Sequence, residues 1–114
     1  IKKNQSEIKS LIGDLDKINI LKPKILADGS HIIRYYSDYK QIYNISFYNK
    51  YKPKFYVYIN YEYYDLNNLI KDQFFDIIIF KKIRNFSNDD FLFLNKNDYI
   101  SINNNNFYIF YKNY

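Results

Sequence analysis

The chain of 114 residues has no cysteine, no methionine and no tryptophan, and it has only two glycines, two prolines and one histidine. Without cysteine there is no disulfide framework, no thiolate nucleophile and no cysteine-bearing metal site. His31 alone cannot make a histidine-rich metal site. With glycine only at Gly13 and Gly29, no glycine-rich phosphate loop can be read. We therefore expect no catalytic residue, no metal, no cofactor and no small-molecule substrate.

Long hydrophobic runs are also missing. The longest apolar stretch, residues 74–80, is interrupted by Asp76, whereas a membrane-spanning helix needs about 18–20 apolar residues. Near the N-terminus, Lys2 and Lys3 are followed by polar residues instead of the apolar region of a signal peptide. The sequence therefore predicts no membrane partner.

Five residue types, Ile, Asn, Lys, Tyr and Phe, make up about two-thirds of the chain, and tyrosine alone occurs 15 times. All five have A/T-rich codons, so the bias is typical of an organellar gene, an AT-rich protist or a large DNA virus. The 17 Lys and Arg residues exceed the 12 Asp and Glu residues and give a net charge of +5. This excess favours an anionic partner, RNA first, although a merely solvated basic surface would show it too.

Two helices are predicted from hydrophobic spacing and capping residues. Apolar residues recur at i, i+3, i+4 and i+7 along residues 7–17, and Ser6 precedes them as a natural N-cap. Ser87 is the N-cap of a second helix with acids in its first turn. The buried side of that second helix is expected to consist of Phe91, Leu92 and Leu94.

Strands are predicted for most of the remaining chain. Asp28-Gly29 separates two apolar runs, residues 24–27 and 31–36, which predicts a β-hairpin. Residues 75–81 are almost continuously apolar, which favours a strand buried on both faces. Residues 61–70 are ambiguous: they could form a short helix, with Asn67-Asn68 as a breaker. The other expected strands are residues 41–47, 55–60, 99–102 and 107–111, and the tract 103–106 is expected to form a turn that tolerates left-handed geometry.

This order of elements predicts the α+β class, with a small mixed or antiparallel sheet and two or three helices packed on one side of it. The chain length is that of one domain. We expect one compact unit with two parts. Residues 1–47 form a part with a helix and a hairpin, and residues 48–114 form a β-rich part with one helix.

Two basic stretches interleaved with aromatic residues, 48–56 and 81–86, are the candidates for RNA contact. Lys and Arg neutralise phosphates, and each unpaired base stacked on Tyr or Phe contributes about 1–3 kcal/mol. The competing interpretation is that the rings belong to the core and the lysines to a solvated surface. The carboxylates at positions 62 and 65, and at 89 and 90, are more typical of caps and loops than of an acid–base pair.

Several segments share their pattern and order with one known family. Residues 6–12 (SEIKSLI) match a Ser-Lys-Leu-Lys-type helix start, and Asp28-Gly29 stands at the position of a hairpin. Residues 51–54 (YKPK) stand in place of a basic Ser-Lys-Pro-Gly loop, and residues 55–57 (FYV) in place of an Arg-Val-Tyr-Val run. The segments 18–21, 32–36 and 42–46 fall between them in the same order. This half of the chain resembles the universal small-subunit ribosomal protein eight family, in a divergent mitochondrial form without its first helix and strand.

The C-terminal half resembles the same family with two departures. Residues 76–79 (DIII) are similar to its strand before a Ser-Thr-Ser-Lys-Gly motif, and residues 87–94 to the helix that follows. Residues 105–110 (NNFYIF) are similar to its closing turn and strand. However, residues 80–84 (FKKIR) replace the Ser-Thr-Ser-Lys-Gly motif, and Asn-Asn replaces Gly-Gly in the turn.

The basic stretches and the resemblance together predict the residues that contact RNA. They are Lys50, Lys52, Lys54, Tyr56, Lys81, Lys82, Arg84, Asn85, Ser87, Asn105 and Asn106.

The resemblance implies a structural protein of the mitochondrial small ribosomal subunit, in the mitochondrial matrix and encoded by the organelle. Its partners would be ribosomal RNA and neighbouring ribosomal proteins, and it would have no catalytic turnover. The alternative is a non-catalytic, protein-only accessory subunit of a respiratory or viral assembly. The aromatic surplus supports this alternative, because it exceeds what a small core can hide.

Overall fold

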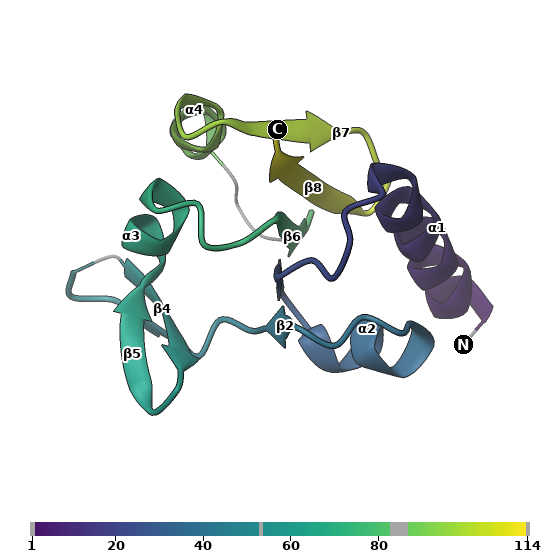
Figure 1. Cartoon of the computed structure of the whole chain (residues 1–114), viewed down its shortest axis with the longest axis horizontal. Coiled ribbons are helices and arrows are strands. Elements are labelled where there is room, and N and C mark those ends of the chain that lie inside the picture. Colours follow the sequence, from purple (N-terminus) through teal and green to yellow (C-terminus); the bar gives the residue numbers. More distant parts are fainter. Residues whose placement is uncertain (1, 53, 83–86, 114) are drawn as a thin grey trace.

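The computed structural model describes residues 2–52, 54–82 and 87–113. Within these ranges the chain forms four helices and eight strands (Figure 1). In order, they are α1 (Lys2–Ile18), β1 (Ile25–Ala27), α2 (Ser30–Tyr36), β2 (Ile42–Tyr43), β3 (Phe47–Asn49), β4 (Lys54–Ile59), β5 (Glu62–Asp65), α3 (Leu66–Lys71), β6 (Ile77–Lys81), α4 (Asn88–Lys96), β7 (Tyr99–Ile102) and β8 (Phe107–Lys112).

The strands form two sheets. The larger sheet has the order β2-β1-β6-β8-β7, in which β1 lies parallel to both β2 and β6, and β8 lies antiparallel to both β6 and β7. The smaller sheet, β3-β4-β5, is antiparallel throughout. The predicted α+β class with a mixed sheet is confirmed.

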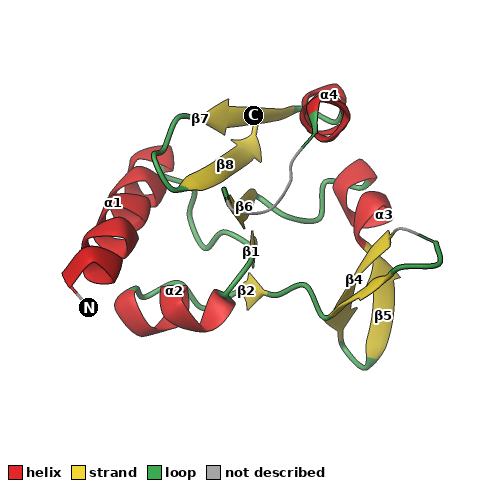
Figure 2. Cartoon of the chain, turned by 180° about the vertical axis from the view of Figure 1, so that it is seen from behind, coloured by secondary structure: helices red, strands yellow, loops and turns green. Residues whose placement is uncertain are grey.

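The five-stranded sheet lies between two layers, as both views show (Figures 1 and 2). On one face, alternate residues of β1, β6 and β8 pack with the apolar side of α1 and with Ile33 of α2. On the opposite face, Leu26 and Ile78 pack with β4, α3 and Leu94 of α4. Helices therefore cover both faces, and the prediction that they lie on one side is wrong.

Strand β6 is the centre of the fold. Ile77, Ile78, Ile79 and Phe80 are all buried, which confirms the predicted burial on both faces. Asp76, which interrupts the apolar run, accepts a hydrogen bond of 2.8 Å from the backbone N–H of Lys24 and lies 3.4 Å from the Lys112 ammonium. The carboxylate thus ties the chain before β1 and the end of β8 to the start of the central strand.

The predicted hairpin at Asp28-Gly29 is wrong. Gly29 has a φ of +77°, as a tight turn requires, but the chain enters α2 instead of a returning strand. Strand β1 already has neighbours on both sides, β2 and β6. Residues 31–36 could not pair with it, and they form the helix whose Ile33 is buried against the sheet.

Other expectations differ in detail. Helix α1 begins at Lys2, so Ser6 lies inside it and is not its N-cap. The predicted strand 41–47 is divided into β2 and the start of β3. Residues 61–70 contain both β5 and α3, and Asn67-Asn68 lies within α3 because the Asp65 side chain caps that helix by accepting from the Asn67 N–H.

The C-terminal elements follow the sequence closely. Ser87 and Asp90 form the capping box of α4, and β7 and β8 occupy the predicted segments. Leu92 is an exception, because its side chain is 63% exposed while Leu94 is buried. The tract 103–106 connects β7 to β8 as predicted, and none of its residues uses the left-handed geometry that such a tract tolerates.

Candidate nucleic-acid interface

The three-stranded sheet presents one face to the core and the other to solvent. Phe55, Val57 and Ile59 of β4 alternate with exposed or half-buried residues and pack against the main core. The strand register places Phe47 of β3 opposite Tyr56, and Tyr63 of β5 opposite Tyr58. These four rings share the outward side of the sheet, and we call them the aromatic face.

The rings of the aromatic face contact one another. Phe47 and Tyr56 stack nearly parallel, with centroids 4.8 Å apart and an interplanar angle of 13°. Tyr63 lies edge-on to Phe47 at 5.1 Å and tilted against Tyr58 at 4.8 Å. Tyr58 is nevertheless 46% exposed and Tyr63 58% exposed. The sheet thus holds a fixed array of aromatic side chains that is open to solvent.

The predicted basic loop is the turn between β3 and β4, at one end of this face. Lys50 and Lys52 are exposed there, and neither forms an ion pair within the part of the chain that the structure describes. The Lys50 ammonium lies 5.4 Å from the centroid of the exposed Tyr51 ring. The turn therefore offers two cations that no carboxylate of the described residues neutralises.

Lys54, the third lysine of this stretch, is paired. Its ammonium lies 2.8 Å from Asp65 on β5, and the hydrogen bond to Asp65 raises the pKa of Lys54. Burial alone would raise the pKa of Asp65, but hydrogen bonds from Lys54 and from the Asn67 N–H outweigh it and hold that pKa below its ordinary value. This pair joins β4 to β5 and to the start of α3, so Lys54 contributes less free charge than predicted.

The second predicted group lies at the end of the five-stranded sheet. Lys81 is half-buried, and its side chain lies alongside Gly29. Lys82 is exposed, with its ammonium 5.7 Å from the Tyr108 ring centroid and its backbone N–H donating to the Asn106 carbonyl at 3.1 Å. The structure therefore brings Lys82 and Asn106 together.

The other residues of this second group have different positions. Ser87 caps α4, and Asn105 is exposed in the turn before β8. Arg84 and Asn85 lie outside the described residues. Within the described part, Lys82 is the member of this group whose exposed cation best fits the predicted phosphate contact.

Sequence reasoning selected Tyr56 but missed Phe47, Tyr58 and Tyr63. The signal was available in the alternation along β4, where every second residue from Lys54 points away from the core. It was hidden because 15 tyrosines make any pair of neighbouring rings weak evidence. The strand register, which the sequence does not reveal, identifies the tyrosines that share a face.

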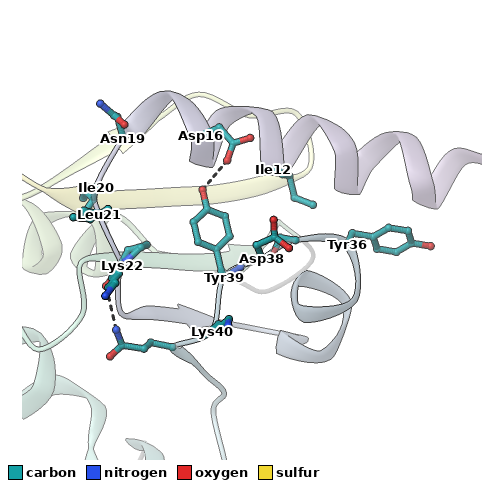
Figure 3. A pocket seen from close by; sticks show the side chains of 13 residues that line it. Ile12, Asp16, Asn19, Ile20, Leu21, Lys22, Tyr36, Asp38, Tyr39 and Lys40 are labelled. Carbon is teal, nitrogen blue, oxygen red and sulfur yellow. Dashed lines mark hydrogen bonds between the residues drawn. The ribbon is translucent and has the colours of Figure 1, made fainter.

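A separate open pocket of about 970 Å³ lies between the end of α1 and the segment after α2. Tyr39 spans it, and its hydroxyl donates to Asp16 on α1 at 2.8 Å (Figure 3). Burial and the neighbouring Asp16 raise the pKa of Tyr39. On the other rim, the Gln41 side chain donates to the Lys22 carbonyl at 3.2 Å. These contacts fasten the two segments together, and this mixed lining does not single out one ligand chemistry.

Among the described residues, no group of three or more acidic or histidine side chains is placed to hold a metal ion. No described helix combines the length and apolar character needed to cross a membrane. Comparisons with protein-family models, curated proteins and solved structures found no match for this chain.

Proposed function

We propose that this protein is a non-catalytic RNA-binding component of a ribonucleoprotein assembly, and specifically a structural protein of a mitochondrial small ribosomal subunit. The RNA-binding part of this proposal is supported by two exposed lysines, Lys50 and Lys52, that lie beside an exposed aromatic face on the same sheet. Neither lysine forms an ion pair within the described part of the chain. The assignment to the ribosome rests on the sequence resemblance.

The physical basis is electrostatic. Cationic side chains that contact phosphates release condensed counterions, so affinity falls as salt concentration rises. Lys50 and Lys52 lie in a turn held by β3 and β4, which fixes their position relative to the sheet. Lys82 adds a cation at the end of the five-stranded sheet, near Asn106. An RNA that contacts both places would be held at two points on the protein, as a structural component of an RNA particle requires.

The direct test measures binding of the purified chain to single-stranded RNA between 50 and 200 mM salt. The expected result is a linear fall of log affinity with log salt, because lysine–phosphate contacts dominate. The double variant K50A/K52A should weaken binding and reduce the slope by about 0.7–1 for each lysine removed. The matched control, K9A/K40A, removes the same charge from exposed positions elsewhere and should retain most of the slope.

Two results would contradict the proposal. A wild-type protein without measurable affinity for RNA at 50 mM salt would exclude the RNA-binding role. The absence of this chain from purified mitochondrial small subunits of the source organism, determined by mass spectrometry, would exclude the ribosomal assignment.

A protein-only accessory subunit is the second candidate. It is favoured by large apolar side chains that are exposed away from the aromatic face, including Leu21, Tyr35 and Leu92. Such side chains are typical of protein contacts in an assembly. A flat response to salt, together with a stable complex containing only proteins, would favour this candidate.

A further inference from the structure

The aromatic face, Phe47, Tyr56, Tyr58 and Tyr63, has a chemistry more specific than general RNA affinity. We infer that it binds an unpaired strand of RNA, in which bases stack on Tyr58 and Tyr63 while phosphates farther along the same strand contact Lys50 and Lys52. This inference rests on the proposed RNA-binding function and adds that the site binds single-stranded rather than double-stranded RNA.

The way the rings pack selects Tyr58 and Tyr63, since Phe47 is also 43% exposed. Phe47 and Tyr56 already cover one another by parallel stacking at 4.8 Å. Tyr58 and Tyr63 are tilted at 56° to each other and keep about half of their surface open. A base can therefore stack against either ring without displacing a partner from the protein.

The exposed rings favour unpaired RNA over a duplex. In a double helix the faces of the bases are covered by their neighbours, so an exposed ring on a sheet has nothing to stack on. An unpaired strand can turn its bases towards the protein, and every base has a π-face, so the site should tolerate different sequences.

The positions of the cations match a short strand of RNA. Lys54 and Tyr58 are four residues apart on β4, which corresponds to about 13 Å. The lysines of the turn lie beyond Lys54. Because a stacked strand carries a phosphate about every 3.4 Å, a segment of roughly four to six nucleotides extends from Tyr58 to the turn. This length agrees with the lower range of sites on sheet platforms that bind single strands.

Charge and ring type favour a nucleic acid over a protein partner at this face. The exposed rings are accompanied by cations at one end, and the Asp65 carboxylate on the same side is already paired with Lys54 at 2.8 Å. The aliphatic residues of β4, Val57 and Ile59, are buried on the opposite side. The solvent side thus combines stacking surfaces with positive charge, which is the combination that single-stranded RNA requires.

The test compares a labelled twelve-nucleotide oligouridylate with an RNA duplex of twelve base pairs, using fluorescence anisotropy and the full chain. Wild-type protein should bind the single strand more tightly than the duplex. Each of Y58A and Y63A should weaken single-strand binding by about five- to 150-fold and change duplex binding little. Y58F and Y63F, which keep the ring, should restore binding to within about threefold of wild type.

Two further variants separate stacking from other effects. Y35A removes an exposed tyrosine on α2, on the other side of the five-stranded sheet, and should leave binding unchanged. Y58L/Y63L keeps apolar surface without an aromatic ring and should bind as weakly as the alanine variants. Circular dichroism and the melting temperature of each variant establish that it is folded.

Distinct results would overturn the inference. If Y58A and Y63A bind the single strand like wild type while K50A/K52A does not, RNA binding stands but the stacking site is wrong. Equal wild-type affinity for single strand and duplex would likewise refute it. If Y58L/Y63L binds the single strand as tightly as wild type, aromatic stacking is not what holds the RNA. If the ring variants abolish only a protein–protein complex, the face is a protein interface. Absence of any RNA binding by wild type would instead remove the proposed function itself.

Discussion

Asn104 offers the sharpest test of how the fold is held together. It is the buried polar residue of the described core, with 5% of its surface exposed. Its side-chain oxygen accepts from the N–H groups of Asn106 and Phe107, at 3.0 and 3.2 Å, and its amide donates to Asp14 on α1 at 2.7 Å. One side chain therefore shapes the turn before β8 and fastens that turn to the first helix.

The substitution N104A removes all three hydrogen bonds. Because the Phe107 N–H is buried, it loses its partner without access to water, which costs about 1–3 kcal/mol. The bonds to Asn106 and Asp14 contribute a further 0.5–1.5 kcal/mol each, roughly, and partial rehydration lowers their sum. We expect the free energy of unfolding to fall by about 2–4 kcal/mol, and the melting temperature by roughly 10–20 °C for a domain of this size.

The assay is urea and thermal denaturation followed by circular dichroism. The matched control is N105A, because Asn105 is the exposed neighbour in the same turn and should change stability by less than about 0.5 kcal/mol. N104D should also destabilise at pH 7, since it places a second carboxylate against Asp14 in place of a donor. If N104A melts within about 2 °C of N105A, the reasoning about this side chain is refuted.

Three further changes test local features. G13A should stabilise the chain by about 0.5–1 kcal/mol in urea denaturation, because Gly13 lies inside α1 and the added methyl group would enter open space; a loss of stability would show that the position is not an ordinary helix interior. Y61G should have a higher melting temperature than Y61A, because Asn60 and Tyr61 both have positive φ in the β4–β5 turn and glycine relieves that strain by about 1 kcal/mol. Equal melting temperatures for the two variants would contradict this. Because folding lowers the pKa of Asp65, its ionised carboxylate stabilises the fold above about pH 4, and this contribution is lost progressively as the pH falls below that value. D65N should therefore be less stable than wild type at pH 7, and the difference in the free energy of unfolding should narrow by pH 2.5 in urea titrations. A difference that does not change with pH would exclude the linkage.

Local patterns predicted the elements whose cause is local. The capping box at Ser87 and Asp90 fixes the start of α4, and the uninterrupted apolar run 77–80 identifies a strand buried on both faces. The hairpin prediction failed because Asp28-Gly29 has the same chemistry whether the chain returns as a strand or enters a helix. The decision depends on β2 and β6 lying beside β1, and no feature near Gly29 encodes that.

The candidate site could be predicted in part for the same reason. Lys50 and Lys52 stand out in the sequence, and the structure places them in an exposed turn. The partners of Tyr56 could not be identified, because contact with Phe47 and the position of Tyr63 depend on the register of three strands. Lys54 illustrates the limit most clearly, since its pairing with Asp65 follows from that register and changes its expected role.

The position of β1 has a consequence for the order of folding. Ile25 pairs with Ile77 in the parallel ladder, so the N-terminal strand cannot complete its pairing until the second half of the chain has emerged from the ribosome that makes it. The β3-β4-β5 unit needs only residues 47–65 and joins its strands by short turns. Its lower contact order makes such a meander faster to form than the parallel pairing of β1 with β6. We expect pulsed hydrogen exchange during refolding to protect β4 before β1, so the surface that we propose for RNA would be in place while the central sheet is still unassembled.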